Sequence, residues 1–210
     1  MATAQAIPEV NRLLTPPSDE ESISLFRPAD ERSKEVNDFI LNHPIAQALR
    51  ENPDFVESRP HMKIPENIRS HSLTGGTLIG PNKLVVPPLS FSERGGKSST
   101  VIIFVGSDLC GHPGIVHGGC LATLLDEVLA RCCFAALPNK VAMTASLSLS
   151  YKAPLPADSY VCLRATTTKV EGRKAWVEGR IESLVSEGET PTVFVEANAL
   201  FIEPRSAAVS

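Results

Sequence analysis

HGGCLATLLDEVLARCCFAAL, residues 117–137, is the stretch that decides the fold of this 210-residue chain. From Gly119 onwards its apolar side chains recur at helical spacing without a gap. They are Leu121, Leu124, Leu125, Val128, Leu129, Cys132 and Ala136. Pro138 ends the pattern, because proline cannot continue helical hydrogen bonding. The stretch therefore predicts one nearly all-apolar helix that the rest of the chain must bury.

Segments with the spacing of β-strands surround this helix. The apolar run 101–105 is typical of a buried central strand. Residues 141–151 alternate, which predicts that Thr144, Ser146, Ser148 and Ser150 share one polar face. The expected strands span residues 73–79, 84–86, 101–105, 141–151, 160–170, 174–184 and 192–202. Long strands with one apolar helix predict an α+β fold, a long antiparallel sheet wrapped around a central helix.

The remaining sequence predicts an extension and one domain. Residues 1–32 carry Pro16-Pro17 and an acidic run and are expected to be a flexible extension. Residues 33–69 are interpreted as a helical preface, broken at Pro44, and a linker that contains His61, which catalysis need not involve. Residues 70–204 form the main domain and 205–210 a tail. A hydrophobic content of 42% is enough for one core.

Asp126 and Glu127 are neighbours on the predicted helix but differ in their surroundings. Arg131 stands four residues after Glu127, in the order that favours a helical ion pair, so Glu127 is expected on a solvated face. Asp126 has no such counter-ion and lies at the margin of the apolar stripe. It is therefore the candidate for a general base or nucleophile, against the alternative of a partly exposed helix residue.

The start of the helix carries two glycines, which cost about 1 kcal/mol each relative to alanine in a helix. A function that needs the missing side chains would explain them. The first amides of a helix are unpaired and lie at the positive end of its dipole, so Gly118 and Gly119 could hold an oxyanion. A plain glycine turn is the alternative. His117 could orient a carbonyl group or be only a structural residue.

These residues, together with the strand from Thr144 to Tyr151 and Pro154, resemble the hotdog-fold acyl-CoA thioesterases. The resemblance covers about residues 70–204. It is strongest to the branch of the phenylacetate-pathway and the carboxy-terminal-modulator-like thioesterases. The resemblance implies that Gly118 polarises the thioester carbonyl, Asp126 acts as base or nucleophile, and Thr144 helps to hold the water. Some members place an asparagine shortly before the histidine, where this chain has Gly111-His112-Pro113-Gly114.

Helix geometry separates the two halves of this site. Asp126 is nine residues beyond His117, about 180° around and roughly 13 Å along the helix. A two-fold dimer would let Gly118 of one subunit face Asp126 of the other. The resemblance implies the same shared site, with dimers that sometimes pair into tetramers.

Binding of the coenzyme A moiety requires cationic or polar donors. Lys152, Arg173 and Lys174 are the candidates for its phosphates. Gly119 would support the turn, and Ser146 would assist Thr144. No metal and no cofactor are expected, since coenzyme A is part of the substrate.

Composition excludes several other classes of protein. The net charge of −4 and the absence of a basic stripe with interleaved aromatics argue against nucleic-acid binding. Five cysteines without paired spacing argue against a disulfide scaffold and a zinc site. No apolar run is long enough to span a membrane, and no signal peptide is apparent. We expect a cytoplasmic protein, with mitochondrial import as the alternative.

The sequence therefore predicts hydrolysis of acyl-CoA thioesters to free acid and CoA. The main alternative is a non-catalytic hotdog protein that binds acyl-CoA or has a regulatory role, since a fold does not determine a function. An acyl-chain dehydratase is a further alternative. Acyl chain length cannot be inferred, because dispersed apolar side chains form such pockets.

Overall fold

A computed structural model describes residues 16–186 and 188–206 of the chain. Seven antiparallel strands form one sheet in the order β1-β2-β3-β7-β8-β9-β6. They are β1 (Phe55–Ser58), β2 (Leu89–Glu93), β3 (Ser98–Val105), β6 (Met143–Tyr151), β7 (Ser159–Glu171), β8 (Lys174–Ser183) and β9 (Val193–Ile202). A small ribbon adds β4 (Cys110–His112) and β5 (Ile115–Val116). The expected antiparallel sheet is confirmed.

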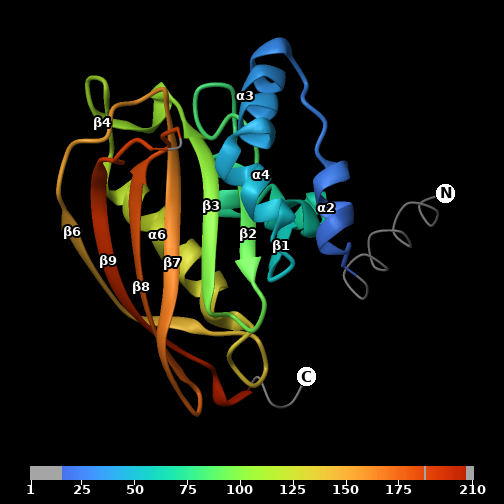
Figure 1. Cartoon of the computed structure of the whole chain (residues 1–210), viewed down its shortest axis with the longest axis vertical. Helices are drawn as coiled ribbons and strands as arrows, with labels where there is room; N and C mark the ends of the chain where they lie inside the picture. The colour runs from blue at the N-terminus through green and yellow to red at the C-terminus, as the bar shows by residue number, and fades with distance from the viewer. Residues whose placement is uncertain (1–15, 187, 207–210) are drawn as a thin grey trace.

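Helix α6 (Gly118–Phe134) lies against the concave face of the sheet, which curves around it (Figure 1). Its apolar side chains, such as Leu125 and Leu129, are fully buried. They pack with inward residues of β3, β7, β8 and β9, such as Ile103, Leu163 and Phe201. This arrangement is the hotdog fold, as the sequence predicted.

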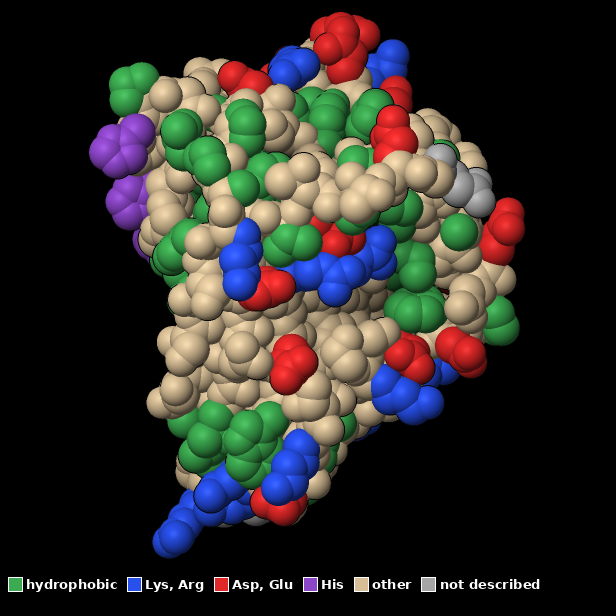
Figure 2. Space-filling model, turned by 60° about the vertical axis from the view of Figure 1, so that its left-hand side comes forward, with side chains coloured by type: hydrophobic (Ala, Val, Ile, Leu, Met, Phe, Trp, Pro, Cys, Tyr) green, Lys and Arg blue, Asp and Glu red, His purple; other side chains and the backbone are tan. Residues whose placement is uncertain are grey.

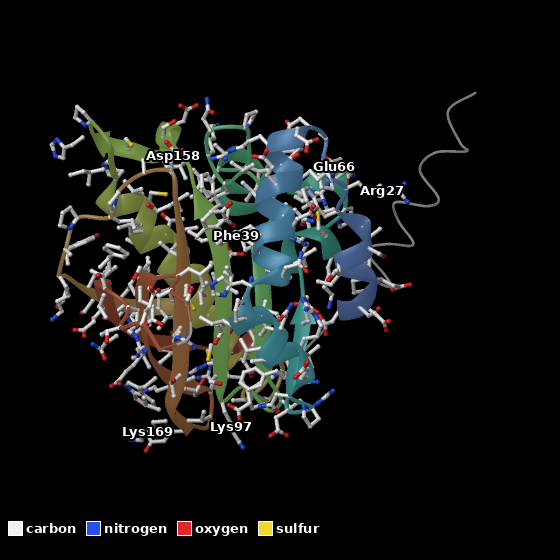
Figure 3. All side chains as sticks on the ribbon, turned by 45° about the horizontal axis from the view of Figure 1, so that its top comes forward. Arg27, Phe39, Glu66, Lys97, Asp158 and Lys169 are labelled. Carbon is white, nitrogen blue, oxygen red and sulfur yellow. The ribbon has the colours of Figure 1, made fainter. Side chains whose placement is uncertain are left out.

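The other helices are α2 (Asp19–Leu25), α3 (Glu31–Asn42), α4 (Pro44–Glu51) and α5 (Glu66–Arg69), with short turns η1 (Pro60–Lys63), η2 (Leu73–Thr77) and η3 (Ser107–Leu109). Helices α3 and α4 are the predicted helical preface, and Pro44 opens the second of them. They cover the outer face of the sheet over β2 and β3, where a second apolar cluster forms. The ring centroids of Phe39, on α3, and Tyr160 are 4.1 Å apart. Figure 3 labels Phe39, which lies in front of the sheet in that view.

Part of the predicted flexible extension is ordered. Residues 1–15 lie outside the described residues, but α2 forms just after them, with a capping box between Ser18 and Glu21. The hydroxyl of Ser22 accepts a 2.9 Å hydrogen bond from the Arg59 N–H. Burial lowers the pKa of the Arg59 guanidinium to about 10. Arg59 donates to Asn37 of α3 at 2.6 Å and to the Pro87 carbonyl, so it joins the amino-terminal layer to the body.

Two expected strands are wrong. In place of the first, residues 73–77 form the π-helical turn η2, in which the Ser72 hydroxyl accepts a hydrogen bond from the Gly75 N–H. A Cβ at Gly76 would collide with the carbonyl oxygens of Arg69 and Ser70. Residues 84–86 are buried coil with a single bridge from Leu84 to Ile79. Strands β1 and β2 were not expected, since their short runs carry little periodicity.

A bulge changes the face of Thr144 on β6. Thr144 pairs with Phe201 of β9 and Ser146 pairs with Leu200, so Ala145 is the extra residue. Phe201 is fully buried beside α6, and paired residues share a face. Thr144 therefore faces the helix, whereas Ser146 faces outward, and the expectation that both share one face is wrong.

The outer face of β7, β8, β9 and β6 is polar, and Figure 2 shows this side of the molecule with clustered charged side chains. Glu182 is nearly fully buried there between two arginines. It accepts hydrogen bonds from Arg164 at 2.6 Å and from Arg180 at 2.5 Å. These contacts pull its pKa down against the opposing effect of burial. This cluster lies on the opposite face of the sheet from α6.

Candidate active site

The amino terminus of α6 presents a free amide. His117 is the N-cap, and its Nδ1 accepts a 2.9 Å hydrogen bond from the Gly119 N–H. A Cβ at Gly119 would lie 3.0 Å from the imidazole, which explains this glycine. Within the described part of the chain, the Gly118 N–H has no hydrogen-bond acceptor. Gly118 therefore offers an unpaired donor at the positive end of the helix, while Gly119 supports the turn.

Tyr151 closes over Gly118, a contact that the sequence did not predict. Its hydroxyl donates a 2.8 Å hydrogen bond to the Gly118 carbonyl. A Cβ on Gly118 would lie 3.3 Å from the ring. The sequence shows Tyr151 only as the last residue of an alternating strand, and the contact depends on how β6 packs against α6. Tyr151 thus joins the candidate site.

Two of the candidate residues, Asp126 and Thr144, are in direct contact. The Thr144 hydroxyl donates a 2.7 Å hydrogen bond to Oδ1 of Asp126. Asp126 is partly exposed, and within the described residues it has no ion pair. The bulge at Ala145 makes this contact available, because it turns Thr144 toward the helix. The result is an accessible carboxylate with one fixed oxygen.

Glu127 does not lie on a solvated face, so that expectation is wrong. The predicted contact with Arg131 is present at 2.8 Å, but Glu127 also accepts a 2.8 Å hydrogen bond from Nε2 of His61. The side chain of Glu127 is only 20% exposed. Burial alone would raise its pKa, but His61, Arg131 and the hydroxyl of Thr74 outweigh burial and lower it to about 2.

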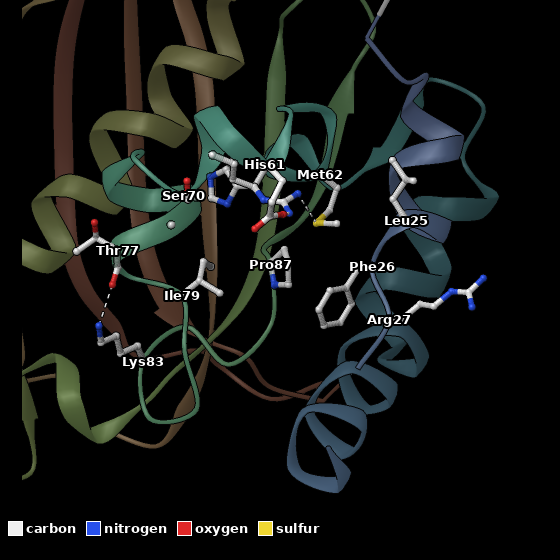
Figure 4. A pocket seen from close by; sticks show the side chains of 14 residues that line it. Leu25, Phe26, Arg27, His61, Met62, Ser70, Thr77, Ile79, Lys83 and Pro87 are labelled. Atoms are coloured by element: carbon white, nitrogen blue, oxygen red, sulfur yellow. Dashed lines mark hydrogen bonds and ion pairs between the residues drawn. The ribbon is translucent and has the colours of Figure 1, made fainter. Parts of the chain in front are cut away.

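His61 is likewise more than a linker residue. Its side chain is 4% exposed, and it lies on η1, 66 positions before Glu127. No spacing in the sequence could have indicated a contact over that separation. Its ring also borders a cavity of about 740 Å3 beneath α2, where Met62, Phe26 and Pro87 form part of the lining (Figure 4).

One chain keeps the two halves of the candidate site apart. Gly118 and Asp126 are eight residues apart on a continuous helix, which corresponds to about 12 Å along its axis. The first half lies with Tyr151 at one end of β6, and the second half lies with Thr144 at the other. A single thioester carbonyl cannot contact both within one chain.

The predicted phosphate-binding residues are also dispersed. Lys152 follows Tyr151 and forms a 2.8 Å ion pair with Glu196. Arg173 donates to the Glu203 carbonyl at 2.7 Å, which gives it a structural contact. Lys174 is exposed at the opposite end of the sheet from Lys152. Ser146 faces away from Asp126, so the structure does not bring it to the site.

The described residues contain no group of three or more side chains that could hold a metal ion. None of the helices that the structure describes is long and apolar enough to cross a membrane.

Comparisons with known proteins place this chain among related sequences. The sequence model of the Thioesterase superfamily matches residues 113–188, from just before α6 to just after β8. A UPF0644 protein of Schizosaccharomyces pombe is 36% identical over 192 residues, which are 90% of this chain and 73% of that protein. A mitochondrial uncharacterized protein of Candida albicans is 28% identical, over 85% of this chain and 86% of that protein.

Two further similarities involve proteins with more informative names. The acyl-coenzyme A thioesterase THEM4 of Mus musculus is 42% identical over 105 residues, which are 50% of this chain and 43% of the mouse protein. Among solved structures, the Escherichia coli PaaI protein from the phenylacetic acid degradation operon is 14% identical, with a TM-score of 0.46. That match covers 53% of this chain and 75% of the PaaI chain.

Proposed function

The chain belongs to the thioesterase superfamily, and we propose that it hydrolyses acyl-CoA thioesters at a site shared by two copies of the chain. The observation that carries the proposal is the hydrogen bond between Thr144 of β6 and Asp126, which lies on the same helix that presents the free Gly118 N–H. The mouse relative matches 50% of this chain, and its name, acyl-coenzyme A thioesterase, supports acyl-CoA as the substrate class.

The chemistry assigns a separate role to each group. The Gly118 N–H donates to the carbonyl oxygen as negative charge develops on it. In one route Asp126 takes a proton from water, the hydroxide attacks the thioester carbon, the C–S bond breaks, and the proton passes to the CoA thiolate. In the other route Asp126 attacks and releases CoA, and water then hydrolyses the mixed anhydride. Both routes use the same residues, so the proposal includes either.

Thr144 assists in both routes. Because its O–H is donated to Oδ1 of Asp126, the free Oδ2 is left for water or for the thioester carbon. The lone pairs of the Thr144 oxygen can accept a hydrogen bond from the attacking water. His117 fixes the turn through its bond to the Gly119 N–H, so that the Gly118 amide points outward.

A second copy of the chain would complete the site. Strand β6 is a nine-residue edge of the sheet that, among the described strands, pairs only with β9. Its exposed residues include Met143 and Tyr151, which are 64% and 55% exposed. Such an edge is a template for pairing with another strand. Antiparallel pairing of two β6 strands about a two-fold axis would place the Tyr151 end of one beside the Thr144 end of the other. Gly118 of one copy would then approach Asp126 of its partner.

The same pairing would gather the cations. Lys152 and Lys174 lie at opposite ends of the sheet in one chain, but the two-fold axis would place Lys152 of one copy and Lys174 of the other at the same end of the joined sheet. They are the proposed donors for the phosphates of coenzyme A. Arg173 is a weaker candidate, because its guanidinium already holds the Glu203 carbonyl.

A mitochondrial location is proposed in place of the cytoplasmic expectation, because the name of the Candida albicans relative places that protein in mitochondria. Fractionation of cells that express the tagged chain tests this point. Recovery of the chain in the cytosolic fraction alone would contradict the mitochondrial location and favour the cytoplasmic one.

The test of the function is the release of free thiol from a panel of short, medium, long and aromatic acyl-CoAs. The wild-type chain should turn over at least one of them, and Asp126→Asn should lower kcat by about 10²–10⁴-fold, the usual contribution of a general base. Glu178→Gln, an exposed carboxylate on the outer face of β8, is the matched control and should retain full activity. No turnover of any acyl-CoA by a folded protein would favour the non-catalytic binding protein instead.

A further inference from the structure

We propose that His61, Glu127 and Arg131 form a positioning network that holds Asp126 in its reactive orientation. This inference rests on the proposed function and assigns new roles to residues beside its site. None of the three is proposed to touch the substrate. They would act through the turn of α6 that carries Asp126.

The network joins three separate segments at one carboxylate. Oε1 of Glu127 accepts hydrogen bonds from Nε2 of His61 at 2.8 Å, and from Nε and Nη2 of Arg131 at 2.9 and 2.8 Å. The hydroxyl of Thr74, on η2, also hydrogen-bonds this carboxylate. Charge-assisted hydrogen bonds of this kind are among the strongest side-chain contacts in proteins. Helix α6 is thereby bonded to η1 and to η2 at Glu127.

Asp126 is held on the other side of the same turn. Adjacent helical residues point about 100° apart, so Asp126 reaches Thr144 on β6 while Glu127 reaches η1. The turn is therefore clamped between the edge strand and the amino-terminal layer. A rotation of this turn would move the Asp126 carboxylate, and a misplacement of about 1 Å can cost about 10²-fold in rate.

Attachment of the amino-terminal layer does not require this network. Arg59 already bonds α2, α3 and the chain before β2, and α3 and α4 bury an apolar cluster against the outer sheet face. A buried ionic network is rarely better for stability than apolar packing. Its place directly beside Asp126 points to orientation of that residue.

The ring of His61 uses only one of its nitrogens. Nδ1 is buried and has no hydrogen-bond partner within the described residues. A side chain that supplies only the Nε2 donor should therefore suffice. The amide nitrogen of glutamine is such a donor, which makes His61→Gln the conservative variant and His61→Leu the disruptive one.

The first experiment measures kcat and KM of these two variants with the best acyl-CoA of the panel. His61→Leu should lower kcat about 10–100-fold, with KM changed less than about threefold, because orientation and not binding is lost. His61→Gln should recover most of the kcat. Circular dichroism and gel filtration of each variant verify that it is folded and assembled as the wild type is.

The second experiment repeats His61→Leu in the Asp126→Asn background. If the network acts through Asp126, the second substitution should change the residual rate little, because the group that it orients is already gone. Glu182→Gln is the control, since it breaks a similar buried network between two arginines on the outer sheet face. It should lower stability and leave kcat unchanged.

The outcomes separate this inference from the proposed function. Wild-type protein that hydrolyses no acyl-CoA would overturn the function itself. Turnover that depends on Asp126, together with an unchanged kcat in folded His61→Leu, would overturn only the network. An equal loss in both backgrounds, or a loss of kcat in Glu182→Gln as large as in His61→Leu, would also overturn it, because the effect would then be general destabilisation.

Discussion

Glu127 has an arginine four residues later, a spacing typical of a helical ion pair on the surface, yet the fold largely buries its side chain. The hydrogen bond from Nε2 of His61 and the charge of Arg131 stabilise its ionised form and lower its pKa to about 2, from an ordinary value of 4.5. Because the folded pKa is below the unfolded one, the ionised carboxylate stabilises the fold above pH 4.5. That contribution disappears as the pH falls from 4.5 toward 2.

Glu127→Gln should therefore destabilise the protein at pH 7 by about 3 kcal/mol, the free energy that corresponds to a shift of this size. The difference in free energy of unfolding between wild type and variant should shrink as the pH is lowered to 3. Urea unfolding at pH 7, 5 and 3, at one protein concentration, measures it. A difference that stays constant over this range would contradict the assignment, and Glu178→Gln should show no such difference.

Strand β6 shows how one extra residue sets the chemistry of an element. Thr144, Leu147 and Leu149 pair with Phe201, Ala199 and Ala197, which are all buried toward α6. Without the bulge at Ala145, Thr144 would point outward with Ser146, because side chains alternate along a strand. The bulge thus lets Thr144 and the apolar side chains share one face.

Deletion of Ala145 should remove the bulge and leave Thr144 facing Asp126, because Thr144 and Ser146 then become successive residues of a regular strand and point to opposite faces. Activity should therefore stay near that of the wild type, whereas Thr144→Val, which loses the hydroxyl but keeps the bulge, should lower it by about 10-fold if the lost bond is worth about 1.4 kcal/mol. Free-thiol release measures both variants. A loss in the deletion as large as in Thr144→Val would show that the pairing of β6 with β9 does not by itself set this contact.

At the scale of the whole molecule, the two halves of the site belong to opposite ends of one helix and one edge strand. A shared site predicts complementation between two inactive chains. Asp126→Asn removes the carboxylate, and Gly118→Val places a side chain against Tyr151, since even a Cβ would lie 3.3 Å from its ring. Each variant alone should be inactive.

Equal mixing with exchange of subunits should restore about one quarter of the wild-type activity, because half of the dimers are mixed and each mixed dimer has one intact site. Refolding the two chains together and measuring thiol release tests this. Confirmed heterodimers without activity would mean that Gly118 and Asp126 do not act across two copies.

Much of the fold followed from local periodicity. The apolar repeat from Leu121 to Cys132 predicted α6, and the long runs after it predicted β6 to β9 within two residues of their ends. The shorter elements were missed or wrong. The turn η2 replaced a strand because Ser72 and two glycines favour a tight turn, and local apolar content cannot express that preference.

The sequence by itself determined the central helix and the sheet around it, because each depends on spacing within one segment. It also made His117, Gly118 and Asp126 candidates through their places on that helix, and the family resemblance added Thr144. Only the tertiary structure decided that Thr144 and not Ser146 meets Asp126, that Tyr151 closes over Gly118, and that His61 holds Glu127. These contacts join segments far apart in the chain, and they depend on strand register and packing. Neither is encoded in the periodicity of a single segment.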